Sequence, residues 1–254
     1  MDDPTFPVVE VFGPTIQGEG VDQGVPCYFI RFGGCDYACN WCDSPHAVLP
    51  ELVRENTTRM NSGDIINAIW ALPSGPKWVV LTGGNPMLLN LEKLVEDLHV
   101  HGYKVAVETQ GSRHKGWVEK ADRICVSPKP PSSGVQGEKS KRALHNFLGL
   151  LSPDALKKTF LKIVVFDGED LDWAEKVITV YSNLDTCLSL GTFPEESIGT
   201  YRGIQGFDGP PDSLESLASR YQELISKTAT KTAFANTRLH VQNHVLAFGH
   251  AIGV

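Results

Sequence analysis

Three cysteines lie within eight residues of this 254-residue chain, and they constrain its fold and chemistry more than any other feature. Three residues separate Cys35 from Cys39, and two separate Cys39 from Cys42. The preceding run, Tyr28 to Phe32, is apolar and aromatic and ends in a glycine pair, which is typical of a strand followed by a loop. Three soft thiolates on one loop favour zinc, copper(I) or an iron–sulfur cluster. A centre held by only three thiolates keeps a fourth position open for chemistry.

Two other interpretations of the thiols remain open on their spacing. A structural zinc site would need a fourth ligand, which His46 or Cys125 could supply. The thiols could also be buried cysteines that only fill space. The aromatic residue Trp41, directly before the last thiol, favours the open cluster. In spacing, aromatic residue and preceding strand, this stretch resembles the cysteine loop of the radical S-adenosylmethionine superfamily.

Length and composition exclude several classes of protein. The chain is long enough for one large core, and an α/β barrel of this length is commonly a single domain. No apolar stretch has the length that crosses a bilayer, and the N-terminus lacks the pattern of a secretion signal, so we expect a cytoplasmic protein with reduced cysteines. The formal net charge of −7 argues against binding to nucleic acid and its phosphates.

Short apolar strands alternate with amphipathic helices along the chain, which predicts βαβ units and a mostly parallel sheet. We expect about six such strands after the first loop, in a partial barrel or open sheet. With the resemblance, the fold class becomes α/β, a partial (β/α) barrel of the radical S-adenosylmethionine type, as one domain over 1–254 with an insertion near 136–158. Strands are expected at 7–12, 28–32, 78–81, 104–107, 123–126, 160–166, 187–190 and 238–244. Helices are expected near 62–70, 91–98, 171–181 and 213–224, the first of them capped by Ser62. A long loop is expected at 193–211.

Polar clusters follow several of the expected strands. Besides the cysteine loop, these are 82–85, 108–110 and 127–129. Ligands of parallel α/β sheets lie beyond the carboxyl ends of the strands, so the clusters are expected to form one site. Glu108 could pair there with a cationic group of a ligand or with a neighbouring lysine, and Lys129 could hold a carboxylate or be solvated.

Asp43 and Ser44 follow the last thiol directly. A carboxylate and a hydroxyl are hard oxygen donors that suit Mg²⁺. The same pair is also a common helix cap, and the residues alone favour the cap.

Five motifs together resemble the 7-carboxy-7-deazaguanine synthase family. They lie at 13–20, 34–37, 83–86, 108–111 and 127–132, and the Gln242-Asn243-His244 run is similar to a Gln-x-His element that the family places at its substrate. The resemblance implies a 4Fe–4S cluster on Cys35, Cys39 and Cys42, with S-adenosylmethionine on its open iron. Reductive cleavage would give a 5′-deoxyadenosyl radical, which would start the ring contraction of 6-carboxy-5,6,7,8-tetrahydropterin to 7-carboxy-7-deazaguanine with loss of ammonia, in queuosine biosynthesis.

The resemblance also assigns roles to other residues. Ser44 would bind Mg²⁺, in place of the cap that the residues alone favour. The residues implied for S-adenosylmethionine are Trp41, Cys42, Asp43, Gly84, Ser127, Pro128 and Lys129, with Gly83 and Glu108 as further candidates. The residues implied for the pterin are Ile16, Gln17, Gly18, Arg31 and Thr82, with Glu19, Gln242 and His244 as further candidates.

The implied partners are a small pterin substrate, an electron donor such as a flavodoxin or ferredoxin, and a second copy of the chain in a homodimer, with no nucleic acid and no membrane. Two other functions remain open. A radical enzyme that activates a partner protein would share the cysteine loop without needing the pterin residues. A non-catalytic zinc module would need a fourth metal ligand.

Overall fold

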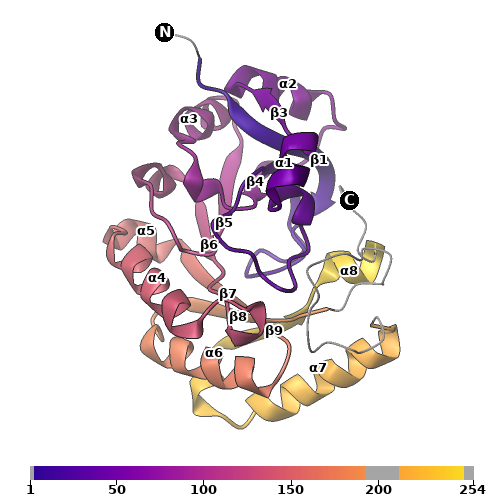
Figure 1. Ribbon diagram of the computed structural model, residues 1–254, viewed down its shortest axis with the longest axis vertical. Helices are drawn as coiled ribbons and strands as arrows, with labels where there is room; N and C mark the ends of the chain where they lie inside the picture. The colour runs from indigo at the N-terminus through magenta and orange to yellow at the C-terminus, as the bar shows by residue number, and fades with distance from the viewer. Residues whose placement is uncertain (1–2, 193–211, 249–254) are drawn as a thin grey trace.

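The structure, a computed structural model, describes residues 3–192 and 212–248, and its described strands form a single curved sheet (Figure 1). The order across the sheet is β3-β1-β2-β4-β5-β6-β7-β8-β9. The strands are β1 (Phe6–Ile16), β2 (Pro26–Phe32), β3 (Thr58–Met60), β4 (Trp78–Gly83), β5 (Lys104–Thr109), β6 (Arg123–Val126), β7 (Thr159–Val165), β8 (Asp185–Leu190) and β9 (Thr237–Val241).

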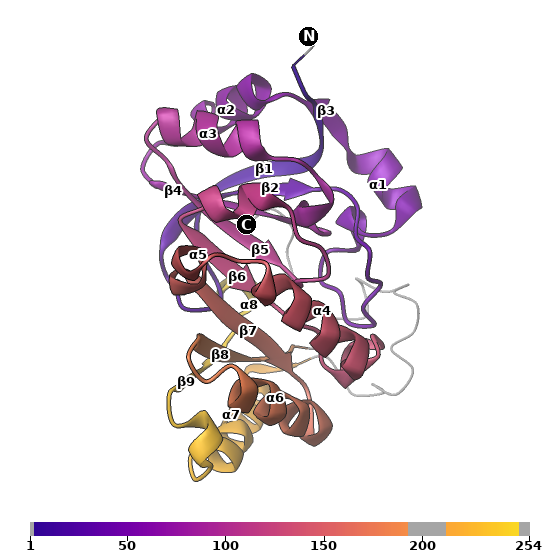
Figure 2. The same cartoon turned by 90° about the vertical axis from the view of Figure 1, so that its left-hand side faces the viewer.

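Strands β2 and β4 to β9 run parallel to one another, whereas β1 is antiparallel to both β2 and β3. Figure 2 shows β4 to β9 following one another across the curved sheet in chain order. Crossover helices join most parallel strands, because the chain must return from the end of one strand to the start of the next, at the opposite edge of the sheet. The helices are α1 (Pro50–Asn56), α2 (Ser62–Trp70), α3 (Glu92–Val100), α4 (Gly137–Gly149), α5 (Pro153–Lys157), α6 (Gly168–Val180), α7 (Leu214–Thr228) and α8 (Asn243–Phe248).

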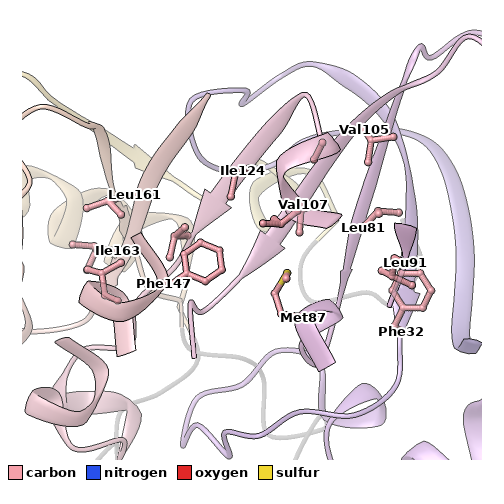
Figure 3. Close-up of a cluster of buried hydrophobic side chains, with 14 of the residues drawn as sticks. Phe32, Leu81, Met87, Leu91, Val105, Val107, Ile124, Phe147, Leu161 and Ile163 are labelled. Atoms are coloured by element: carbon pink, nitrogen blue, oxygen red, sulfur yellow. The ribbon is translucent and has the colours of Figure 1, made fainter. Parts of the chain in front are cut away.

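Alternation along the strands gives the sheet two different faces. In β7, Leu161, Ile163 and Val165 belong to the hydrophobic core under the helices, so the side chains between them point to the opposite face. Figure 3 shows the core side, where Leu81, Val107 and Ile124 of three strands and Phe147 of α4 belong to one buried cluster. The opposite face, here called the inner face, carries Arg31 of β2, Thr82 of β4, Glu108 of β5, Lys162 of β7 and Ser189 of β8.

The α/β fold with a mostly parallel open sheet is confirmed, and several details differ from expectation. The parallel set has seven described strands, and the short edge strand β3 was not expected. Ser62 was wrong as a cap, because Asn61 caps α2 through a reciprocal capping box with Asp64. The last strand ends at Val241 rather than at residue 244, because Asn243 begins α8.

The segment 136–158 provides the crossover between β6 and β7. It forms α4 and α5, and Leu144 and Phe147 of α4 belong to the core. That it is an insertion, and that the chain is one domain, stay predictions. The expected loop at 193–211 lies outside the described residues. None of the described helices is long and apolar enough to cross a membrane.

Candidate active site

The cysteine loop begins where β2 ends and leads into the short 3₁₀ helix η1 (Pro45–Ala47). Cys35, Cys39 and Cys42 are half-buried, and none forms a disulfide. Burial raises the pKa of all three thiols, to about 11 for Cys39 and about 12 for Cys42. Removal from water disfavours a bare thiolate, so a metal centre would supply the compensating positive charge.

Asp36 anchors this loop to the neighbouring strand ends. One of its carboxylate oxygens accepts hydrogen bonds from Asn85 Nδ2 at 2.9 Å, Gln110 Nε2 at 2.9 Å and Ser112 Oγ at 3.0 Å. The other lies 3.2 Å from Nε of Arg113. Asn85 follows β4, and the other three donors follow β5. One carboxylate thus joins the cysteine loop to two of the polar clusters, 82–85 and 108–110.

The residues implied for S-adenosylmethionine partly converge beside this loop. The ammonium of Lys129 lies 5.3 Å from the centre of the Trp41 ring and donates to Ser127 Oγ at 3.2 Å. Its charge also lowers the pKa of Cys39 against the larger effect of burial, so it stands near the thiols. Trp41 is fixed by a 2.9 Å hydrogen bond from Nε1 to Ser132 Oγ. Pro128, which lies between Ser127 and Lys129 in the chain, is buried, whereas Asp43 is exposed.

Gly83 and Gly84 have a packing requirement of their own. A Cβ on Gly83, which has a φ of 139°, would lie 2.1 Å from the Phe32 carbonyl oxygen, and one on Gly84 would lie 2.0 Å from that of Gly34. No side chain fits there, because the turn after β4 hydrogen-bonds the end of β2 through Gly84 N and Phe32 O. This contact holds the β4 turn against the cysteine loop.

The arrangement fits an iron–sulfur cluster better than a zinc ion. In residues 3–192 and 212–248, no three or more His, Cys, Asp and Glu side chains are grouped closely enough to bind a single metal ion. Cys125 lies on β6 next to Lys162, and His46 contacts Glu10, so neither joins the thiols. A cubane spreads its three thiolates over separate iron atoms, as a loop of three free, half-buried thiols allows.

The inner face carries a second polar group around Glu108 of β5. Gln17 Nε2 donates to one carboxylate oxygen of Glu108 at 3.1 Å, and Thr82 Oγ1 donates to the other at 3.1 Å. The structure therefore groups Glu108 with two residues implied for the pterin, although the sequence made it a further candidate for the cofactor. Both donors orient the Glu108 carboxyl group at the carboxyl edge of the sheet.

Glu19 lies deeper on the same face and is surrounded by donors. Lys162 Nζ lies 2.7 Å from Oε2, while Ser189 Oγ and Gln242 Nε2 donate to Oε1 at 2.8 and 3.1 Å. Burial would raise the pKa of Glu19, but Lys162, with smaller contributions from His244 and Ser189, lowers it to about 2. Glu19 is therefore a fully ionised carboxylate in the protein interior.

The remaining candidates for the pterin have contacts of their own. His244, near the start of α8, lies against Gly18. A Cβ on Gly18 would lie only 2.1 Å from Nδ1 of His244. Ile16 is the last residue of β1. Arg31 Nε lies 2.5 Å from Glu10 and its Nη1 donates to Ser44 Oγ at 2.8 Å. Burial opposes the charge of Glu10, but contacts with His46 and Arg31 lower its pKa below the usual value.

Sequence reasoning missed Lys162, Glu10, Asp36 and Ser189. A signal existed for Lys162, because a lysine inside an otherwise apolar strand is rarely buried without a partner. Glu10 and Ser189 follow the alternation of their strands and give no signal of their own. Asp36 was quoted only as part of a motif.

Comparison with known proteins connects this geometry to a family. The chain is 34% identical over 252 residues to the 7-carboxy-7-deazaguanine synthase of Bacillus cereus, which covers 98% of this chain and 99% of that protein. The chain belongs to the 7-carboxy-7-deazaguanine synthase family. The synthase of Bacillus subtilis is 31% identical over 256 residues, with 98% of both chains covered. No family model matches the chain.

Solved structures support the fold. QueE from Escherichia coli superimposes with a TM-score of 0.63 at 22% identity, over 94% of this chain and 95% of that one. Streptococcus suis SuiB bound to S-adenosylmethionine gives 0.56 at 15% identity, over 82% of this chain and 48% of that one. Membership of the synthase family confirms the enzyme class, a radical S-adenosylmethionine enzyme, and implies S-adenosylmethionine and a 4Fe–4S cluster as its cofactors.

Proposed function

We propose that this protein is a 7-carboxy-7-deazaguanine synthase, which contracts the ring of 6-carboxy-5,6,7,8-tetrahydropterin to 7-carboxy-7-deazaguanine and releases ammonia. The carrying observation is the meeting of two sites at one edge of the sheet. The cysteine loop with Trp41 and Lys129 forms one, and the inner-face group of Gln17, Thr82 and Glu108 forms the other. Reactions that start at a cofactor need the substrate held next to it.

The cofactor side follows from the thiols. Cys35, Cys39 and Cys42 would hold the cluster, and Trp41, Asp43, Gly84, Ser127, Pro128 and Lys129, with Gly83, would hold S-adenosylmethionine. When bound, the cluster and S-adenosylmethionine supply the radical that starts the rearrangement. The chain's own residues bind, orient and shield the reactants. The hydrogen bond from Trp41 to Ser132 fixes the indole ring of Trp41 for this role.

The substrate side matches a pterin carboxylate and a pterin ring edge. A guanidinium has five N–H donors in a planar fork, and the bonds from Arg31 to Glu10 and Ser44 use two of them. The others can hold the substrate carboxylate in a charge-assisted pair, with the fork oriented beforehand. Glu108, an acceptor on the same face, suits the N–H groups of the pyrimidine edge.

Mg²⁺ belongs to the proposal through Ser44. A magnesium ion there would take the Ser44 hydroxyl, substrate oxygens and water as its ligands, as this metal commonly does. Glu10 beside Arg31 and Asp43 beside Ser44 would offset the added positive charge. The flavodoxin or ferredoxin donor, the homodimer and the cytoplasmic location are proposed with the function.

The test is anaerobic turnover together with substrate binding. Cluster-loaded wild type should convert 6-carboxytetrahydropterin to 7-carboxy-7-deazaguanine, detected by mass spectrometry. Arg31→Ala should weaken pterin binding on the order of 100-fold, because a desolvated charge-assisted pair is lost. Its affinity for S-adenosylmethionine and its iron content should stay near those of wild type.

Glu10→Gln provides a matched control, because it removes the negative charge of the internal partner of Arg31 and keeps the guanidinium. It should bind the pterin far better than Arg31→Ala does. A cluster-loaded wild type that neither binds nor converts the pterin would refute the proposal and leave a radical enzyme with another substrate.

A further inference from the structure

Lys162 is the charged residue in the fully buried strand β7. It is 6% exposed, and its neighbours Leu161 and Ile163 point into the core on the other face. A buried ammonium is strongly unfavourable unless opposite charges and hydrogen bonds compensate its lost hydration. The ammonium of Lys162 therefore needs partners on the inner face, where an apolar side chain would need none.

The compensation comes from two glutamates of distant segments. Lys162 Nζ lies 2.7 Å from Glu19, which stands between β1 and β2, and 3.4 Å from Glu108 of β5. Burial would lower the pKa of Lys162, but the charges of Glu108 and Glu19 raise it well above its usual value. Two carboxylates and one ammonium leave this triad with a net charge of −1.

The two carboxylates differ in their surroundings. Glu19 has a side chain that is 10% exposed and accepts further bonds from Ser189 and Gln242. Glu108 is 19% exposed and accepts bonds from Gln17 and Thr82 at the edge where the strands end. Glu19 is thus a fixed internal anion, and Glu108 is the member of the triad placed to meet a ligand.

We propose that Lys162 is a positioning residue for substrate: standing between Glu19 and Glu108, it keeps both ionised and holds Glu108 as an acceptor for the N–H edge of the pterin. The inference rests on the proposed function. Two carboxylates that share a site without a cation share a proton, because like charges disfavour double ionisation. A protonated Glu108 would offer a donor to a ring edge that needs an acceptor.

Other titratable groups face the triad from each neighbouring element. Their pKa values are raised by burial for Cys27 of β2, Cys125 of β6 and Cys187 of β8, and lowered by burial for His240 of β9. His244 of α8 lies beside Glu19, and Arg238 of β9 lies near Cys187. All of these groups are present in every variant below, so their titration cancels in the comparison with wild type.

The experiment measures the affinity for 6-carboxytetrahydropterin, anaerobically and with the cluster-loaded enzyme, from about pH 6 to about pH 8.5. Wild type is compared with Lys162→Met and with the double variant Glu19→Gln/Lys162→Met. In the double variant the group again has a net charge of −1, as in wild type, so it is the matched control.

Lys162→Met should bind more weakly as the pH falls, by about tenfold per pH unit below the pKa of the shared proton, because binding then requires its removal. Wild type and the double variant should show no such slope. A flat profile for Lys162→Met, or a slope that persists in the double variant, would overturn the proposal. If Lys162→Met does not fold, Lys162→Gln serves instead, because it also removes the cation but can still donate hydrogen bonds; a slope supports the proposal and a flat profile overturns it.

An infrared titration without substrate separates this inference from the proposed function. Lys162→Met should gain a protonated carboxyl band within the same pH range, and the double variant should not. If wild type fails to bind the pterin, the proposed function fails, and the infrared result still decides the role of Lys162. If Lys162→Met gains no carboxyl band, the proposed role of Lys162 is refuted.

Discussion

Ser44 illustrates how a single side chain can connect two sites. It precedes η1, but its hydroxyl makes no capping hydrogen bond there. Instead it accepts from Arg31 and donates to Asp43 Oδ1 at 3.0 Å, and the residue is 6% exposed. The hydroxyl therefore lies between the end of the cysteine loop and the guanidinium proposed for the substrate, which is where a bridging cation would act.

Ser44→Ala should weaken the response of turnover to added Mg²⁺, with an apparent Mg²⁺ affinity lower by about tenfold, which corresponds to the loss of one ligand worth about 1.4 kcal/mol. Iron content should not change. Turnover is measured against Mg²⁺ concentration, with Ser44→Thr as a control that keeps the hydroxyl. Wild-type Mg²⁺ dependence in Ser44→Ala would show that Ser44 only orients Arg31.

At the scale of elements, the cysteine loop is held by its neighbours more than by its own backbone. Asp36 receives donors from the segments after β4 and after β5. Gln110 is 5% exposed, and its amide nitrogen also lies 3.5 Å from Cys35 Sγ. One carboxylate thus couples the position of the first thiol to two strand ends.

Asp36→Ala should loosen the loop and speed loss of the cluster, because it leaves buried donors without an acceptor at about 1–3 kcal/mol. Iron release to a chelator should be about tenfold faster, and hydrogen exchange should increase over 33–44. Asp97→Ala on the surface of α3 is the control and should behave as wild type. Unchanged iron release would show that the thiols alone fix the loop.

Across the whole molecule, Glu19 joins segments that are far apart in the chain. Its carboxylate contacts Lys162 of β7, Ser189 of β8 and Gln242 after β9, so the loop after β1 is fixed to the far end of the sheet. Further contacts support this closure, since Gln23 donates to Val241 O at 2.8 Å and Asn243 N bonds Gly18 O at 3.0 Å. These contacts bring the two ends of the inner face together.

The stability of the protein should therefore depend on Glu19 in acid. Its pKa falls from 4.5 to about 2 on folding, so the stabilisation is complete above pH 4.5 and is lost as the pH falls towards 2. This pKa shift contributes on the order of 3 kcal/mol to the free energy of unfolding at neutral pH. Urea unfolding of the cluster-free protein should show this loss in wild type but not in Glu19→Gln. The exposed Glu223→Gln should follow wild type, and an acid dependence of Glu19→Gln equal to that of wild type would contradict the assignment.

Features that depend on neighbours in the chain could be predicted before the fold was known. The spacing of Cys35, Cys39 and Cys42, together with Trp41 and the preceding strand, carried the resemblance to the superfamily, and the alternation of apolar strands with helices predicted the parallel sheet. The polar clusters after β4, β5 and β6 also had to meet, because parallel strands end at the same edge. Local periodicity and spacing are sufficient for such inferences.

Which polar side chains contact one another could be seen only from the tertiary structure. Glu19 and Lys162 are 143 residues apart, and Glu19 and Gln242 are 223 apart, so no local pattern could pair them. Glu108, a further candidate for the cofactor, contacts Gln17 and Thr82, two residues that the resemblance implies for the pterin. The reason is physical: the curvature of the sheet and the folding back of the loop after β1 bring these side chains to one face, and burial there makes charge pairing obligatory.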